Sequence, residues 1–374
     1  MRIERLTVRE IQLPLRVPFA TAYGQVDHRR LLLVELEDGD GTPGWGECVA
    51  GAVPGYTAET VESAWSTITD QLGPVVLGQD VEDPSGYFRG TDDIFPDQPM
   101  ARAAIEMACW DLAARREGLP LAGLLGGTRT EVPAGIALGI VETPDQTAAA
   151  AAEAFGQGYQ RVKLKIEPGA DLDVVRAVRE RVGDRMALSV DGNGAYTRND
   201  FDHLAGLDEF RLQMIEQPLP PGDLEGHADL QRRLATPVCL DESIMRIADL
   251  EDMIALGAGR VLNLKPGRVG GFTTALTMVD RAFAAGLELW VGGMLETGIG
   301  RAHNVALASL DVFALPGDLS PSARYWERDI VDPPWTMTAG ALEVPRVEPG
   351  IGVVPDRERI RSLTTRAQEF RGAD

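Results

Sequence analysis

The sequence predicts an α/β protein whose main part is a TIM-type barrel. From residue 132 onward, short apolar runs alternate with stretches of helical periodicity, which is typical of a parallel sheet buried on both faces. Five of the runs end in a polar residue, at spacings of 26, 25, 25 and 24 positions. These residues are Lys165, Asp191, Glu216, Asp241 and Lys265. Such a period fits successive βα units of a barrel, whose active sites lie at the carboxyl ends of the strands.

The first third of the chain predicts a separate α+β unit. Residues 1–37 favour strands, and Asp38-Gly39-Asp40-Gly41 is a turn signal that favours an antiparallel meander. Residues 57–72 and 101–117 have helical periodicity, and the second helix is expected to end at Gly118-Leu119-Pro120 because glycine and proline terminate helices.

The barrel strands are expected over short apolar runs, and the dinucleotide-binding glycine fingerprint that would favour an open doubly wound sheet is absent. The predicted strands are residues 132–138, 161–166, 186–190, 212–215, 238–240, 261–264 and 287–291, and the helices between them include residues 144–155, 171–182 and 250–256.

After Pro316 the chain is rich in proline and glycine, and it predicts coil with short strands followed by a helix over residues 357–371. We expect this tail to pack back on the N-terminal unit. The predicted organisation is therefore an α+β unit (1–130), a barrel with a metal site (131–318) and a C-terminal tail (319–374).

Composition narrows the class of protein. The 374 residues are 44% hydrophobic, which is enough for sizeable cores, and the formal charge is −21. A surface that negative disfavours nucleic acid and anionic membranes as partners. The three cysteines show no metal-binding or disulfide pattern, and neither a signal peptide nor an apolar run of membrane-spanning length is seen. We expect a soluble cytoplasmic protein.

The use of basic residues is uneven. Of 36 lysines and arginines only three are lysine, at positions 163, 165 and 265. A coding preference explains the abundance of arginine but does not explain where lysine is kept. Because arginine cannot lose its proton whereas a desolvated lysine can, these positions indicate a need for a titratable amine.

The three carboxylates at strand ends predict a metal site. Asp191, Glu216 and Asp241 are expected to converge on one small volume, where they cannot all stay ionised without a cation between them. Hard oxygen ligands select Mg²⁺, or Mn²⁺. The alternative is that each carboxylate only caps the helix that follows it.

The lysines then suggest a reaction. Lys163 and Lys165 are two positions apart on one strand and so face the same side, into the barrel, while Lys265 comes from across the barrel mouth. Amines on both sides of a metal ion suit removal of a proton from carbon next to a carboxylate, because a divalent cation stabilises the charge that develops on the oxygens. A lysine near other cations loses its proton readily and can act as the base.

An ordered series of motifs surrounds these residues. The motifs are Val162-Lys163-Leu164-Lys165, Asp191-Gly192-Asn193, Ile215-Glu216-Gln217-Pro218, Leu240-Asp241-Glu242-Ser243 and Asn263-Leu264-Lys265-Pro266. The series resembles the muconate-lactonizing subgroup of the enolase superfamily, which uses a lysine base and Mg²⁺. Residues 265–271 and 292–300 more narrowly resemble the o-succinylbenzoate synthases and the related N-acylamino acid (N-succinylamino acid) racemases. The resemblance spans nearly the whole chain, residues 1–354.

The resemblance implies a role for each polar residue. Asp191, Glu216 and Asp241 would hold Mg²⁺. In synthase chemistry Lys165 would remove the α-proton of a cyclohexadiene carboxylate and then protonate the departing hydroxyl, with Lys265 as a cation over the enediolate. In racemisation Lys165 and Lys265 would exchange the α-proton on the two faces of the substrate.

The remaining roles concern positioning and the pocket. Lys163 would lie near the substrate carboxylate and make Lys165 a better base, and Asn193 and Glu242 would orient the metal ligands and Lys265. The N-terminal unit would cap the barrel mouth, with residues 18–24 and 51–56 as closing loops. The expected pocket residues are Phe19, Tyr23, Tyr56, Met294 and Leu295, each of which could equally be an ordinary packing residue.

Several functions stay open at this level. Dehydration to o-succinylbenzoate, a step of menaquinone synthesis, and racemisation of an N-succinylamino acid need the same polar residues. A muconate cycloisomerase is a further alternative, and a dipeptide epimerase is disfavoured because residues 292–296 lack an Asp-x-Asp pair. A non-catalytic barrel is disfavoured by the retained lysines, since arginine would bind carboxylates as well. The expected substrate is a small carboxylate, and the expected assembly is a homo-oligomer.

Overall fold

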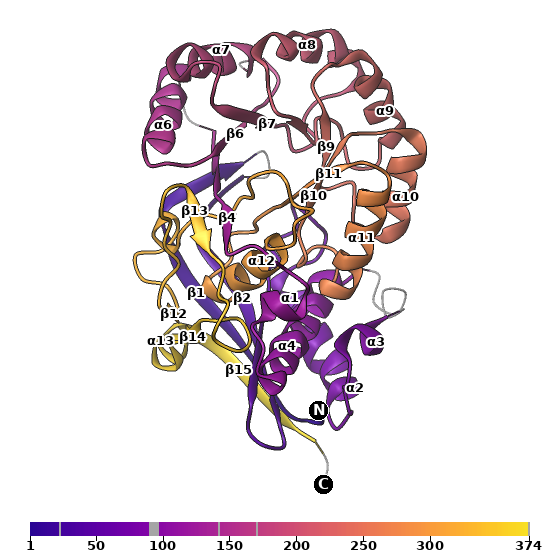
Figure 1. The fold of residues 1–374 in the computed structure, drawn as a ribbon, viewed down its shortest axis with the longest axis vertical. Coiled ribbons are helices and arrows are strands. Elements are labelled where there is room, and N and C mark those ends of the chain that lie inside the picture. The colour runs from indigo at the N-terminus through magenta and orange to yellow at the C-terminus, as the bar shows by residue number, and fades with distance from the viewer. Residues whose placement is uncertain (22–23, 90–96, 141–142, 170, 373–374) are drawn as a thin grey trace.

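The computed structural model describes residues 1–21, 24–89, 97–140, 143–169 and 171–372 (Figure 1). A four-stranded antiparallel sheet with its own helices lies against a seven-stranded parallel sheet that is surrounded by helices. We call the first part the cap and the second the barrel. This arrangement confirms the predicted α/β fold with a TIM-type barrel and a capping unit. Within the described residues, no helix is both long and apolar enough to cross a membrane.

The cap sheet has the strand order β15-β1-β2-β3, so the end of the chain lies beside its beginning (Figure 1). Its middle is buried on both faces, because alternate residues of β2 from Leu31 to Leu36 enter different clusters of apolar side chains. The cap elements are β1 (Ile3–Thr21), β2 (Gly24–Asp38), β3 (Pro43–Cys48), α1 (Val61–Ser66), a π-helical stretch (Thr67–Leu72), α2 (Gly73–Val76), α3 (Pro84–Phe88), α4 (Pro99–Glu117), α5 (Leu121–Leu124), α13 (Arg357–Leu363) and β15 (Thr364–Arg371).

Two glycines let the long helix α4 lie directly on β3. Gly44 and Gly46 are two positions apart, so both face the helix. A Cβ atom on Gly46 would lie 2.0 Å from the backbone oxygen of Ala104, and one on Gly44 would lie 2.3 Å from that of Ala108. Only glycine fits at these two positions, which explains why glycine occurs at both.

The barrel strands are parallel and neighbour one another in sequence order, from β5 to β11. Helices α6 to α11 form an outer arc around them (Figure 1). The strands are β5 (Gly135–Leu138), β6 (Arg161–Lys165), β7 (Ala187–Asp191), β8 (Ile215–Glu216), β9 (Val238–Leu240), β10 (Val261–Leu264) and β11 (Glu288–Val291), and the helices are α6 (Pro144–Gly156), α7 (Asp171–Val182), α8 (Phe201–Ala205), α9 (Leu224–Arg233), α10 (Ile247–Leu256), α11 (Phe272–Ala284) and α12 (Gly298–Ala308).

The segment around Gly317 and Asp318 closes the barrel between the two edge strands. The backbone N–H of Asp318 donates to the oxygen of Val291 on β11 (3.0 Å), and the oxygen of Gly317 accepts from Gly135 on β5 (2.7 Å). This segment therefore occupies the eighth position of the ring. Outside the ring, β4 (Glu131–Pro133) pairs with β13 (Ala341–Glu343), and β12 (Val331–Asp332) pairs with β14 (Val354–Pro355).

Two buried glutamates of the cap bind the first turns of barrel helices. Glu47 at the end of β3 accepts from the backbone N–H groups of Thr297 (3.1 Å) and Gly300 (3.0 Å), at the start of α12. Glu106 of α4 accepts from the N–H of Thr273 (2.7 Å), in the first turn of α11. Both contacts satisfy N–H groups that a helix leaves unpaired at its N-terminus, and they fix the cap to the barrel.

Several expectations about individual elements were wrong. Residues 18–21 were expected in a closing loop but belong to β1, where Phe19 pairs with Val26 of β2. Residues 357–371 form α13 and then strand β15, because residues 364–371 complete the edge of the cap sheet by pairing with β1 from Arg5 to Ile11. The expected first barrel strand over residues 132–138 is divided at Ala134, since β4 pairs with β13 and only β5 belongs to the barrel.

Candidate active site

A cavity of about 430 Å³ lies between the cap and the carboxyl ends of the barrel strands. All three lysines of the chain line it. Phe19 and Tyr56 from the cap also line it, as do Met294 and Leu295 after β11. The expected pocket residue Tyr23 lies outside the described residues.

Strand β6 contributes two of the lysines, and their spacing of two turns both toward the cavity. The Nζ atom of Lys165 donates to Oδ2 of Asp191 (2.6 Å), on the neighbouring strand β7, and to Oδ1 of Asn193 (2.7 Å). Asn193 lies in the left-handed backbone region, with φ of 43°, and its own N–H donates to Oδ1 of Asp191 (2.9 Å). This bend after β7 thus brings a carboxylate and an amide oxygen to the same amine.

The third lysine lies four ring positions away, because β7, β8 and β9 separate β6 from β10. In a ring of eight positions this is the opposite side of the barrel mouth. The Nζ atom of Lys265 donates to Oδ2 of Asp241 (2.8 Å) and to the hydroxyl of Tyr56 (3.1 Å). Arg268, which is fully buried, also donates to Asp241 and to the Tyr56 hydroxyl, the latter at 3.0 Å. Burial raises the pKa of Asp241, but the charges of Lys265 and Arg268 outweigh this effect and lower it.

Glu216 lies between these two groups, at the end of β8, and is fully buried. Its Oε1 atom accepts from Nδ2 of Asn263 (2.8 Å), and its Oε2 atom lies 3.0 Å from Nζ of Lys163. Burial and the nearby charge of Asp191 raise the pKa of Glu216 to about 8. With these neighbours alone, Glu216 would hold a proton at neutral pH.

The donor set fits a hard divalent cation, although the carboxylates do not converge as ligands in the described residues. Their oxygens instead face the amines and Arg268. Three carboxylates that are at most 1% exposed come from the adjacent strand ends of β7, β8 and β9, and they offer only oxygen donors. The raised pKa of Glu216 further indicates that ionising the whole set requires additional positive charge.

Glu242 is joined to this cluster through Asn193, whose Nδ2 donates to its Oε1 atom (2.8 Å). Burial, followed by the charge of Asp241, raises the pKa of Glu242 to about 7. Gln217 orients the next strand end, since its Oε1 atom accepts from the N–H groups of Asp241 (3.0 Å) and Ser243 (3.1 Å).

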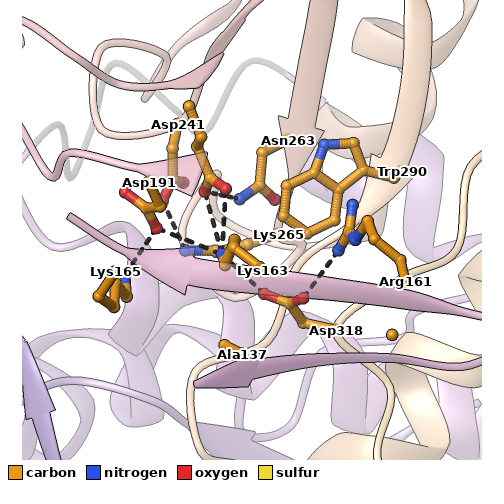
Figure 2. A network of polar contacts seen from close by, with 12 residues as sticks. Ala137, Arg161, Lys163, Lys165, Asp191, Asp241, Asn263, Lys265, Trp290 and Asp318 are labelled. Carbon is orange, nitrogen blue, oxygen red and sulfur yellow. Dashed lines mark hydrogen bonds and ion pairs between the residues drawn. The ribbon is translucent and has the colours of Figure 1, made fainter. Parts of the chain in front are cut away.

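Asp318 and Arg161 also belong to the site, although they were not predicted from the sequence. Figure 2 shows that the carboxylate of Asp318 lies between Lys163 and Arg161 (2.8 Å and 2.7 Å). Arg161 in turn stacks on Trp290, 4.0 Å from the ring centre. Arg268 was also missed. The spacing Lys265-x-x-Arg268 was the available signal for Arg268. Asp318 follows an isolated bridge residue, Gly317, and no strand, so no period marks it.

The predicted polar residues therefore come together at consecutive strand ends that the period of 25 had linked. Five of them line the cavity, namely Lys163, Lys165, Asn193, Asp241 and Lys265. The arrangement offers an amine on each side of a buried carboxylate cluster, with a mostly apolar wall from the cap. Such a site can bind an anionic group beside a cation and move a proton from either side.

Comparisons with known proteins give the family. Residues 3–126 match the model of the mandelate racemase / muconate lactonizing enzyme N-terminal domain, and residues 146–359 match the enolase C-terminal domain-like model. The chain is 43% identical over 370 residues to an o-succinylbenzoate synthase of Geobacillus kaustophilus, covering 99% of this chain and 98% of the relative. It is 44% identical over 371 residues to an N-succinylamino acid racemase of Amycolatopsis sp., covering 98% of each chain.

A solved structure agrees with this assignment. An enolase superfamily member from Listeria innocua superposes with a TM-score of 0.94 at 37% identity, with 99% of each chain covered. The family resemblance expected from the motifs is thus confirmed, and members of the superfamily generally depend on a divalent metal ion. The chain belongs to the mandelate racemase / muconate lactonizing enzyme family of the enolase superfamily.

Proposed function

We propose that this protein is a Mg²⁺-dependent lyase that removes the proton α to a carboxylate and dehydrates a cyclohexadiene carboxylate to o-succinylbenzoate. One observation carries the proposal: Lys165 and Lys265 flank a buried carboxylate cluster from opposite sides of the barrel mouth. The o-succinylbenzoate synthase of Geobacillus kaustophilus, which is similar over nearly its whole length, supports the choice of reaction.

Asp191, Glu216 and Asp241 are the residues that would hold the metal ion. Mg²⁺ is the expected ion and Mn²⁺ an alternative, because all the protein donors are carboxylate oxygens. When bound, the ion would supply positive charge to the carboxylate oxygens of the substrate as the α-carbon is deprotonated.

The lysines would perform the chemistry on the substrate. Lys165 would accept the α-proton, which leaves the electron pair in an enediolate, and Lys265 would contribute positive charge on the opposite face. The C–O bond to the β-hydroxyl would then break, and Lys165 would return its proton to the departing hydroxyl so that water leaves. Lys163 would lie against the substrate carboxylate, and Asn193 and Glu242 would orient the metal ligands and the amines.

The pocket wall would come from the cap and from the segment after β11. Phe19, Tyr56, Met294 and Leu295 line the cavity, and their apolar atoms would exclude water from the reacting carbon. The hydroxyl of Tyr56 accepts a hydrogen bond from Lys265, so Tyr56 would also help to position the amine of Lys265.

Racemisation of an N-succinylamino acid is the second candidate function. The 44% identity to the Amycolatopsis racemase supports it, as does the presence of an amine on each side of the cluster. In this reaction one lysine would remove the α-proton and the other would deliver a proton to the opposite face, so the configuration at carbon would be inverted.

Activity measurements on the Mg²⁺-loaded protein test both candidates. Dehydration is followed by the loss of absorbance of the cyclohexadiene, and racemisation by α-proton exchange in D₂O together with optical rotation. Dehydration much faster than racemisation supports the lyase, and the reverse supports the racemase. If neither dehydration nor exchange occurs, both assignments are wrong and muconate cycloisomerase substrates become the next test.

Lys165→Arg separates catalysis from binding. Arginine keeps the positive charge but cannot accept a proton, so turnover is expected to fall at least about a thousandfold while the product o-succinylbenzoate still binds. Arg268→Lys is a matched control that retains charge at a buried position on the opposite side, and its dehydration rate is expected to fall far less. Equal rates in Lys165→Arg and the unsubstituted protein would contradict the role of Lys165 as base.

Three broader expectations also stay predictions. A homo-oligomer is tested by light scattering, and a cytoplasmic location by fractionation of the source cells. The division into segments 1–130, 131–318 and 319–374 is tested by hydrogen exchange, in which each segment is expected to show its own level of protection.

A further inference from the structure

Asp318 divides its two carboxylate oxygens between two cations. Its Oδ2 atom lies 2.8 Å from Nζ of Lys163, and its Oδ1 atom accepts from Nη2 of Arg161 (2.7 Å; Figure 2). The backbone of Asp318 is fixed as well, because its N–H donates to Val291 at the edge of β11. Both the backbone and the side chain of Asp318 are therefore held in place.

Arg161 is a rigid partner for Asp318. It is fully buried at the start of β6, and the central carbon of its guanidinium group lies over Trp290, 4.0 Å from the ring centre. The indole N–H of Trp290 donates to the sulfur of Cys239 (3.4 Å), so the ring is also anchored. A planar guanidinium stacked on an aromatic ring has few alternative positions.

Lys163 lies among three carboxylates that compete for it. Besides Asp318 at 2.8 Å, its Nζ atom lies 3.0 Å from Glu216 and 3.3 Å from Asp191. The last two are the proposed metal ligands, so an ammonium ion bound to them opposes the binding of a divalent cation. The shortest of the three contacts is the one to Asp318, and Figure 2 shows Asp318 and Asp191 on different sides of Lys163.

We propose that Asp318 is a positioning residue that holds the ammonium group of Lys163 off the metal carboxylates, with Arg161 and Trp290 as its support. The inference rests on the proposed function only in taking Asp191 and Glu216 as metal ligands. Without Asp318, the ammonium group keeps the carboxyl groups of Asp191 and Glu216 as neighbours, both of them needed by the metal ion.

Titration calorimetry with Mn²⁺ tests this role without any substrate. Asp318→Asn preserves the shape of the side chain and removes its charge, and its Kd for Mn²⁺ is expected to rise about tenfold. In a Lys163→Met background, the same substitution is expected to change the Kd less than threefold, because there is no ammonium group left to reposition. This double-mutant cycle distinguishes an action through Lys163 from a general effect of charge.

The outcomes separate the possible failures. A change below threefold in Asp318→Asn, or a loss of equal size in the Lys163→Met background, overturns the inference. If the unsubstituted protein binds no Mn²⁺, the proposed metal site itself is wrong. Absence of enzymatic activity with normal Mn²⁺ binding refutes the proposed reaction and leaves the role of Asp318 standing.

Two further variants guard against a folding defect. Arg161→Met removes the support of Asp318 without touching the carboxylates, and it is expected to raise the Kd for Mn²⁺ in the same direction by a smaller factor. Asp329→Asn is the matched control, because Asp329 is also a buried aspartate but accepts from Gly298 and Ile330 and not from a lysine. Its Kd is expected to stay within twofold of the unsubstituted value. If Asp318→Asn does not fold, an unchanged Kd in Arg161→Met overturns the inference.

Discussion

Glu47 makes the attachment of the cap to the barrel sensitive to pH. Its side chain is fully buried at the end of β3, and both carboxylate oxygens accept from the first turn of α12. Burial, together with the charge of the adjacent Glu296, raises the pKa of Glu47 to about 7 despite the hydrogen bonds from Thr297. The segment that follows β3 leads to Tyr56 at the cavity, so this contact also supports the pocket wall.

The sign and size of the effect follow from the two pKa values. Since the pKa of Glu47 in the folded state lies above its ordinary value of 4.5, the folded protein binds the proton more tightly than the unfolded chain. The stabilising contribution is therefore fully present below about pH 4.5 and is lost as the pH rises through 7. At about 1.36 kcal/mol per pKa unit, the whole effect is about 3 kcal/mol, of which about 2 kcal/mol falls between pH 5.5 and 8.5.

Urea unfolding of the protein and of Glu47→Gln at pH 5.5 and 8.5 measures this contribution. A glutamine cannot titrate, and in either orientation its NH₂ group meets a backbone N–H, so the variant is expected to be less stable at both pH values. The free energy of unfolding of the unsubstituted protein is expected to be higher than that of the variant, and this difference is expected to shrink by about 2 kcal/mol from pH 5.5 to 8.5. Glu131→Gln on the exposed side of β4 is the control, with no such change expected. A difference that stays constant within about 0.5 kcal/mol would refute the reasoning.

Three further perturbations are expected to have distinct results. Lys265→Arg keeps a cation but cannot pass a proton, so racemisation should fall at least about a thousandfold and dehydration no more than about a hundredfold, and equal losses would contradict the division of roles. Removal of metal by a chelator should abolish turnover and lower the melting temperature, since Mg²⁺ at a hundred times its Kd stabilises by about 2.7 kcal/mol, and a melting temperature indifferent to Mg²⁺ would count against the metal site. Gly46→Ala should destabilise by about 3 kcal/mol in chemical unfolding, because its Cβ would meet the backbone of α4 at 2.0 Å, whereas Gly156→Ala has open space and should be neutral.

Much of the site could be predicted because residues that recur at the strand period of a barrel lie close together in space. Lys165, Asp191, Glu216, Asp241 and Lys265 each stand at or directly after a strand end, and adjacent strands must bring their ends together. No knowledge of side-chain conformation was needed for that step. The period of 25 therefore predicted both the fold and the polar cluster at once.

The contacts that the sequence could not reveal are set by tertiary structure. Residues 364–371 become a strand because the edge of β1 needs hydrogen-bond partners, and nothing local requires this. Asp318 follows Gly317, which makes backbone hydrogen bonds with Pro133 and Gly135 but forms no strand, so hydrophobic periodicity has nothing to detect there. The bonds of Tyr56 to Lys265 and Arg268 likewise join residues more than 200 positions apart.

The basic residues of the site include two arginines of the cap, Arg29 and Arg30, which line the cavity together with the lysines. Every lysine of the chain lines the cavity, where a group that gains and loses a proton can reach a substrate. The arginines Arg161 and Arg268 are fully buried and paired to Asp318 and Asp241, where a permanent charge is required. A binding protein would gain nothing from keeping lysine at these three positions, because arginine binds carboxylates at least as well as lysine. The retention of lysine beside the carboxylates is therefore an argument for proton transfer that is independent of any relative, and exchange of these lysines for arginine is the substitution to which the protein should be least tolerant.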